Sequence, residues 1–143
     1  MNSAGASDRF FPASPETLLA WILHGLELGE VFGVAQSLFF TPKPDDPFRT
    51  LSHGRLLETP LGAAAGPHTQ LAQNIVSAWL CGARFIELKT VQVKDSLTLT
   101  RPCIDASDEG YNCEWSQELS LDESFGQYLS AMALIHVLRE LLG

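Results

Sequence analysis

Apolar residues recur at helical spacing near the start of the chain. After Ser14, a typical N-cap residue, leucine and isoleucine side chains repeat every three or four positions up to Leu26. Gly29 or Gly33 would end this helix. The following segment, 41–47, contains three prolines, which lack amide donors. We therefore expect a linker there and not a helix or a central strand.

The pattern changes at residue 48. Residues 48–51 and 55–59 flank a short turn that contains a glycine, which predicts a β-hairpin. Residues 60–65 then form an uncharged run of strand length. A helix is expected from Thr69, as its cap, to about Leu80.

Residues 84–88 predict a second strand, with Lys89 and Thr90 at its carboxyl end. A strand, a helix and a strand within about 30 residues form a βαβ unit, whose two strands are parallel. A parallel sheet needs cover on both faces, so the fold class is α/β, either a barrel or a doubly wound sheet.

Residues 91–121 form a long connection, with a strand pair expected around 97–99. The last helix, from near Asp122 to Leu142, carries apolar residues on every side of its axis, which predicts burial on all sides. One βαβ unit offers too little surface to bury such a helix. A complete (β/α)8 barrel needs roughly 200 residues or more.

We therefore expect the N-terminal portion of a larger (β/α)8 TIM barrel. In this division, residues 1–47 are a helical prefix with a proline-rich linker. Residues 48–143 are the first part of the barrel, which is incomplete in this chain.

The chain is acidic, with 9 Lys and Arg against 17 Asp and Glu and a net charge of −8. Because such a chain repels phosphate backbones, we expect no nucleic-acid partner. The window 59–83 lacks charged side chains, but prolines, glycines and amides interrupt it, so no membrane span is expected. The N-terminus does not resemble a secretory signal, which favours a cytoplasmic location.

The three cysteines, Cys81, Cys103 and Cys113, form no C-x-x-C pair, so we expect reduced structural thiols and no metal site. The acidic run between Asp105 and Glu114 is expected to be a solvated loop, with a docking surface as the alternative. Two histidines on apolar helices, His24 and His136, are expected in the core.

Ligands of parallel α/β folds bind at the carboxyl ends of the strands. The segment Ala63-Ala64-Ala65-Gly66-Pro67-His68 reaches that end, as do Lys89 and Thr90. Small residues allow close approach to a flat ring, while a cation and a hydroxyl suit an electron-rich cofactor or its phosphate. The alternative is that the alanines only pack the strand against the helix and Lys89 is a surface lysine. Phosphate-loop and dinucleotide-binding fingerprints are both absent from this segment.

The run LETPLGAAAGPHTQLAQNIVSAWLCGARFIELKTVQ, residues 57–92, resembles the opening βαβ unit of the dihydroorotate dehydrogenase-like flavoprotein barrels. The segments GPHTQLAQN, FIELKTVQ and CIDASDEGYNCEWSQEL are more similar to one branch, the large flavin and iron–sulfur subunits of the selenate reductase family. That branch is related to dihydropyrimidine dehydrogenase. The resemblance covers roughly residues 14–142 and implies FMN at the mouth of a (β/α)8 barrel.

The resemblance also implies site residues. Those that would contact the flavin are Ala64, Ala65, Gly66, Lys89 and Thr90. Gly110-Tyr111-Asn112 partly matches the substrate loop of dihydroorotate dehydrogenases, although the preceding Asn-Arg has no counterpart. Glu118 is a candidate match to a substrate-loop glutamate of the dihydropyrimidine branch. His68 is a candidate ligand or proton relay at the mouth, or else a loop residue that helps to cap the helix.

In this family the catalytic base, the flavin phosphate loops, the iron–sulfur clusters and the FAD and NAD(P) module lie further along the chain. We therefore expect an FMN-dependent oxidoreductase domain of a multi-cofactor electron-transfer enzyme, inactive as an isolated fragment. Its partners would be a small-molecule substrate or electron acceptor, with selenate implied by the family label, and downstream domains or other redox subunits. The alternatives are a non-catalytic scaffold or electron-transfer subunit without flavin, and a dihydropyrimidine or dihydroorotate dehydrogenase proper.

Overall fold

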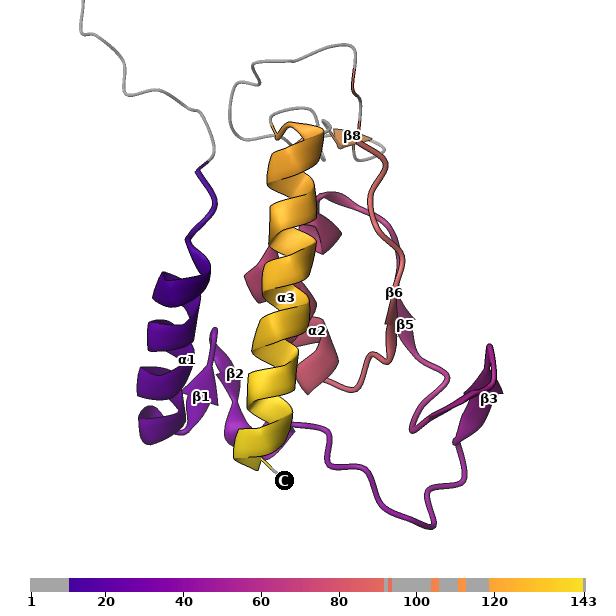
Figure 1. Ribbon diagram of the computed structural model, residues 1–143. Helices are drawn as coiled ribbons and strands as arrows, with labels where there is room; N and C mark the ends of the chain where they lie inside the picture. Colours follow the sequence, from indigo (N-terminus) through magenta and orange to yellow (C-terminus); the bar gives the residue numbers. More distant parts are fainter. Residues whose placement is uncertain (1–10, 92, 94–103, 106–110, 113–118, 143) are drawn as a thin grey trace, which may run out of the picture.

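Two helices lie in the middle of the molecule, with a third helix on one side of them and a pair of parallel strands on the other (Figure 1). The computed structural model describes residues 11–91, 93, 104–105, 111–112 and 119–142. Its helices are α1 (Pro15–Leu28), α2 (Ala72–Leu80) and α3 (Leu121–Leu142), with two short 3₁₀ turns, η1 (Gln36–Leu38) and η2 (Pro67–Gln70). Its strands are β1 (Glu30–Val31), β2 (Val34–Ala35), β3 (Thr50–Ser52), β4 (Arg55–Leu57), β5 (Gly62–Ala63), β6 (Phe85–Ile86), β7 (Ile104–Asp105) and β8 (Tyr111–Asn112).

Helix α1 begins and ends where the sequence predicts. The Ser14 hydroxyl accepts a hydrogen bond from the Thr17 backbone N–H at 3.2 Å, as an N-cap does. Gly29 ends the helix in the left-handed conformation, with φ of 81°. A short antiparallel hairpin, β1–β2, follows directly and was not predicted; Phe32 and Gly33 form its turn with positive φ.

The second hairpin, β3–β4, is confirmed. Its strands pair antiparallel from Thr50↔Leu57 to Ser52↔Arg55. The turn between them is tighter than expected, because His53 and Gly54 both adopt positive φ, as a two-residue hairpin turn requires. Segment 41–47 contains neither helix nor strand, which confirms that prediction.

The βαβ unit is confirmed as well, with β5 and β6 parallel in the register Gly62↔Phe85 and Ala63↔Ile86. Both strands are shorter than the predicted 60–65 and 84–88. The prediction that Thr69 caps the helix is wrong. Its hydroxyl donates to the Gly66 carbonyl at 3.0 Å and accepts from the Gly66 N–H at 3.2 Å, which fixes η2. Helix α2 therefore starts only at Ala72.

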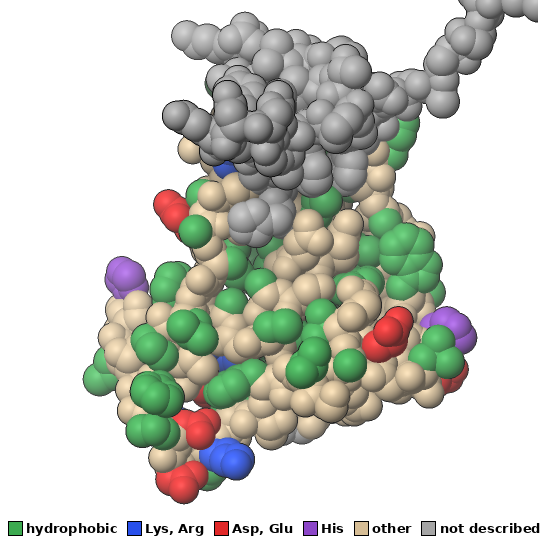
Figure 2. Space-filling view, turned by 180° about the vertical axis from the view of Figure 1, so that it is seen from behind, with side chains coloured by type: hydrophobic (Ala, Val, Ile, Leu, Met, Phe, Trp, Pro, Cys, Tyr) green, Lys and Arg blue, Asp and Glu red, His purple; other side chains and the backbone are tan. Residues whose placement is uncertain are grey.

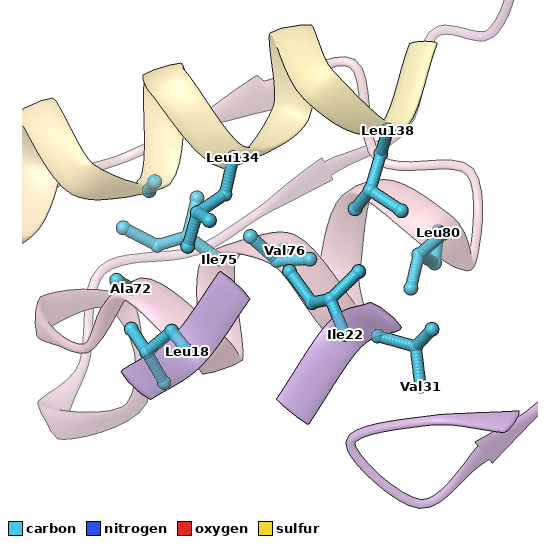
Figure 3. Close-up of a cluster of buried hydrophobic side chains, with 10 residues drawn as sticks. Leu18, Ile22, Val31, Ala72, Ile75, Val76, Leu80, Leu134 and Leu138 are labelled. Carbon is cyan, nitrogen blue, oxygen red and sulfur yellow. The ribbon is translucent and has the colours of Figure 1, made fainter. Parts of the chain in front are cut away.

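One apolar core joins the three helices (Figure 3). Leu18 and Ile22 of α1 meet Val76 of α2 and Leu138 of α3 there, and all four are fully buried. The segment before residue 48 thus contributes to the same core as the βαβ unit. The proposed boundary between prefix and barrel stays a prediction.

Helix α3 confirms its predicted extent but not its predicted burial. Its buried positions, Ser124, Gln127, Ala131, Leu134 and Leu138, follow one stripe at spacings of three and four. Other apolar side chains on α3 are exposed; these are Leu121, Phe125, Leu129, Met132, Val137, Leu141 and Leu142. The described residues cover only one face of α3, as expected if one βαβ unit offers too little surface to bury this helix, so burial on all sides stays a prediction.

The expectation that His24 and His136 lie in the core is also wrong, because both are exposed. His24 instead lies 3.7 Å from the Glu27 carboxylate, one helical turn along α1. No helix within the described residues is both long enough and apolar enough to span a bilayer. The described strands form two-stranded sheets and do not close a barrel.

Arg84, at the start of β6, connects several elements. Its Nε donates to the Glu58 carboxylate at 2.7 Å, and its Nη1 donates to the carbonyls of Trp79 and Ala83, both at 3.0 Å. The guanidinium lies 5.0 Å from the Phe40 ring centre and 5.4 Å from that of Trp79. It therefore satisfies carbonyls at the end of α2, where a positive charge also favours the helix dipole.

Glu58 gives this contact a pH dependence. Burial alone would raise the pKa of its carboxyl, but hydrogen bonds from its own backbone N–H and from Arg84, with the positive charge of Arg84, outweigh burial and lower the pKa below 4.5. A carboxyl with a lowered pKa stabilises the fold above its unfolded pKa and loses that contribution as pH falls through its folded pKa.

We predict that Glu58→Gln lowers the free energy of unfolding by about 1 kcal/mol near neutral pH. The difference from the wild type should hold from about pH 7 to pH 5 and shrink below that, because wild-type Glu58 then becomes protonated. Thermal unfolding of both proteins across this range measures it. A difference that stays constant down to about pH 3 would contradict the lowered pKa.

Gly25 allows α1 to approach β1 closely. A Cβ at this position would lie 2.5 Å from the Glu30 carbonyl oxygen, which is backbone and cannot rotate away. We predict that Gly25→Ala lowers the free energy of unfolding by about 1–3 kcal/mol. Gly126→Ala is the matched control, because its Cβ meets nothing within 4 Å and helical alanine is favoured over glycine. Urea unfolding should show opposite signs for the two variants.

Candidate functional site

The candidate site is the edge at which β5 and β6 end. Because the strands are parallel, their carboxyl ends lie at the same edge of the sheet. The Glu87 N–H donates to the Ala63 carbonyl at 2.9 Å, which extends the pairing beyond the strands. The Ala65 N–H then donates to Oε2 of Glu87 at 3.0 Å. The structure thus brings the predicted alanine segment against the segment that leads into Lys89 and Thr90.

The turn after β5 is small and well held. Ala64 and Ala65 are exposed and carry only methyl groups, so the backbone there can be approached closely. Gly66 is buried in an extended conformation, and Thr69 bonds both its N–H and its carbonyl. The turn therefore presents a fixed backbone surface at the edge.

The segment after β6 adds polar groups to the same edge. Lys89 is half-buried and Thr90 is exposed. Together they supply a cation with three donors and a hydroxyl that can donate or accept. Such a set suits an electron-rich or anionic ligand.

Behind this edge, Gly62 lies against the ring of Phe85, its partner across the strands. A Cβ at position 62 would overlap that ring, so glycine is required for the observed packing. The ring covers a strand position that has no side chain of its own. Close packing of the two strands directly precedes the turn that carries the site.

Two of the candidate substrate residues lie within the described structure, and their roles at this edge stay predictions. The backbone of His68 lies in η2, which directly follows Gly66. Asn112 lies in β8, paired with Ile104 of β7. Other positions singled out from the sequence lie outside the described residues; these are Cys103, Gly110, Cys113, Glu118 and the strand pair around 97–99.

Glu87 is a site residue that the sequence analysis did not single out. A signal was present, because it is the one charged residue between the apolar residues Phe85, Ile86 and Leu88. The Glu87 side chain is exposed, and its carboxylate can accept a hydrogen bond from a backbone N–H within its reach. Here the donor is the Ala65 backbone N–H, 22 positions away.

Polar side chains also line the contact between η2, α2 and α3. The Gln127 side-chain oxygen accepts from the Ala72 N–H at 3.2 Å. Among the described residues, buried polar atoms of Gln70, Gln73 and Ser124 find no hydrogen-bond partner. Burial raises the pKa of the Tyr128 phenol, so it stays neutral at physiological pH.

Metal ligands do not gather in the part of the chain that the structure describes: no group of three His, Cys, Asp or Glu residues is close enough to hold an ion. Cys81 is a free, exposed thiol at the end of α2. The arrangement at the β5–β6 edge therefore points to binding by backbone, cation and hydroxyl.

Comparison with known proteins identifies relatives. Two curated proteins named "Putative oxidoreductase YgfK", from Escherichia coli strain K12 and from Escherichia coli O157:H7, are each 51% identical over 109 residues. The match covers 76% of this chain and 10% of each relative, so the chain spans about a tenth of the length of the curated relatives it matches. No solved structure matches. The family model described as "Oxidoreductase YgfK, N-terminal TIM-barrel domain" matches residues 32–143, and the chain therefore belongs to this oxidoreductase family.

Proposed function

We propose that this chain forms the flavin-facing first part of an FMN-dependent oxidoreductase barrel. The observation that carries the proposal is the β5–β6 edge, where the Ala64–Gly66 turn and the Lys89–Thr90 segment lie at the carboxyl ends of two paired parallel strands. This edge is where barrel enzymes place their ligands. Membership of an oxidoreductase family supports a redox cofactor over other ligands.

The residues present suit FMN. The exposed backbone of Ala64 and Ala65 leaves room for a planar ring, since the side chains of these two residues are only methyl groups. Lys89 and Thr90 provide a cation and a hydroxyl for an electron-rich ring system. A bound flavin would supply the electron or hydride transfer, which protein side chains cannot perform alone.

The chain's own residues would place the cofactor and set its electrostatics. The Gly66–Thr69 hydrogen bonds hold the turn so that the backbone at 64–65 is presented without rearrangement. The Lys89 ammonium would stabilise negative charge that develops on a reduced ring. Thr90 would donate a hydrogen bond at the same edge.

We predict that the full-length protein binds FMN and that Lys89→Met weakens the binding about tenfold, because one charge-assisted contact is lost. The control is Lys43→Met in the exposed segment 41–47, which removes the same charge far from the edge. Flavin absorbance of the purified proteins and a fluorescence titration with FMN measure both variants.

The outcome also separates the alternatives. A colourless full-length protein that does not take up FMN would contradict the proposal and favour the scaffold without flavin. Turnover of a dihydropyrimidine or of dihydroorotate by the flavin-loaded protein would favour a dehydrogenase of that branch. Reduction of selenate would support the electron-transfer enzyme with FAD, NAD(P) and iron–sulfur clusters in other domains.

We further propose that additional strands complete a barrel around this unit. A groove of about 1000 Å³, lined by both apolar and charged side chains, lies between β6 and the helices α2 and α3. Its lining includes the exposed side chains Phe85, Leu88 and Met132. Figure 2 shows apolar side chains spread over the face of the molecule that is turned away from the view of Figure 1.

The direction of α3 suits a further strand. Its last residues lie at the end of the molecule where β6 begins (Figure 1), and Arg139, Glu140 and Leu142 line the groove. A segment that continued from α3 through the groove would run parallel to β6, as βαβ connections do. The relatives are long enough to supply it, because this chain matches only 10% of their length.

We predict that a cysteine introduced by Met132→Cys reacts slowly with a maleimide in the native full-length protein, because a strand would cover it. Leu51→Cys, on hairpin β3–β4, is the control and should react fast, since residue 51 is 74% exposed. Mass spectrometry of the labelled peptides gives both rates, with urea-unfolded protein as the upper limit. Equal native rates at the two positions would contradict barrel completion.

A further inference from the structure

The Glu87 side chain accepts a hydrogen bond that a backbone carbonyl accepts in a regular parallel ladder. In a regular parallel ladder, the bond after Glu87 N–H to Ala63 O would run from the Ala65 N–H to the Glu87 backbone carbonyl. Here the Glu87 side chain takes that bond, with Oε2 at 3.0 Å from the Ala65 nitrogen. Glu87 therefore makes two hydrogen bonds to the end of β5 and the turn after it, one through its own N–H and one through its carboxylate.

Two consequences follow for the edge. The side-chain bond releases the Glu87 carbonyl from the ladder, so Leu88 to Thr90 can depart from the line of β6. The same bond keeps the Ala65 peptide fixed although the strand pairing has ended. The two segments of the candidate site are thus joined by one carboxylate.

We propose that Glu87 is a positioning residue that clamps the Ala64–Gly66 turn to the end of β6 in the geometry that receives the cofactor; this inference rests on the proposed function. Glu87 acts through an acceptor oxygen that a side chain of glutamate length can bring to the Ala65 N–H. Its charge is not what holds the turn. Charge alone would act in the opposite direction, because a carboxylate repels an anionic flavin phosphate and an electron-rich ring.

Three substitutions in the full-length protein distinguish the effect of side-chain length from the effect of charge. Glu87→Gln keeps an acceptor oxygen at the same reach without the charge, Glu87→Asp keeps the charge but shortens the reach, and Glu87→Ala removes both. Glu27→Ala is the control, since this glutamate of α1 has a side chain 79% exposed. Two quantities are measured for each: FMN affinity by fluorescence titration, and hydrogen exchange of the Ala65 amide by NMR.

We expect Glu87→Ala and Glu87→Asp to weaken FMN binding about tenfold and to speed exchange at Ala65, because a hydrogen bond to a charged group is lost. Glu87→Gln should stay within about threefold of the wild type in both measurements, and Glu27→Ala should change neither. If Glu87→Ala does not fold, the Asp and Gln variants still make the comparison.

Several results would overturn the clamp. Unchanged exchange at Ala65 in both Glu87→Ala and Glu87→Asp would show that the carboxylate does not hold the turn. Tighter FMN binding by both Glu87→Gln and Glu87→Ala would show that it acts only through its charge. A wild-type protein that binds no FMN would remove the proposed function, while the exchange measurement would still decide whether the clamp exists.

Discussion

The contacts of Arg84 are the constraint on which the βαβ unit depends. One guanidinium binds the Glu58 carboxylate after β4, the Trp79 carbonyl in the last turn of α2 and the Ala83 carbonyl between α2 and β6. It also lies against the rings of Phe40 and Trp79. Its side chain is only 9% exposed, so these interactions are little screened by water. Because several groups share this guanidinium, the loss of a single partner such as Glu58 still leaves it hydrogen-bonded to two carbonyls.

This constraint fixes one end of the β5–β6 pair, and Glu87 fixes the other. Near Arg84, the Thr59 hydroxyl donates to the Gly82 carbonyl at 2.6 Å, which ties the approach to β5 to the turn before β6. At the opposite end the Glu87 carboxylate holds the Ala65 N–H. Two charged side chains on one strand segment thus set both ends of a strand pair whose regular pairing is very short.

Local signals predicted much of the fold. Ser14 and Gly29 mark α1 because capping depends on residues that are adjacent in sequence. The parallel strand pair followed from the order strand, helix, strand. The start of α2 and the role of Glu87 could not be predicted in the same way. Thr69 has the chemistry of a cap but bonds Gly66 instead, and the partner of Glu87 lies 22 residues away, where only the folded register brings it.

Helix α3 shows how the candidate edge depends on distant parts of the chain. Leu71 precedes α2 and offers no side-chain cap, but Gln127 supplies one from α3, 55 residues later, by accepting the Ala72 N–H. The buried stripe of α3 is polar where it meets this end of α2 and apolar at Leu134 and Leu138, where the three helices share their core. Docking of α3 thus completes the start of α2 directly behind the turn at Gly66. The edge that would receive a cofactor is therefore a product of tertiary packing, although the residues that face the cofactor lie in two short segments of sequence.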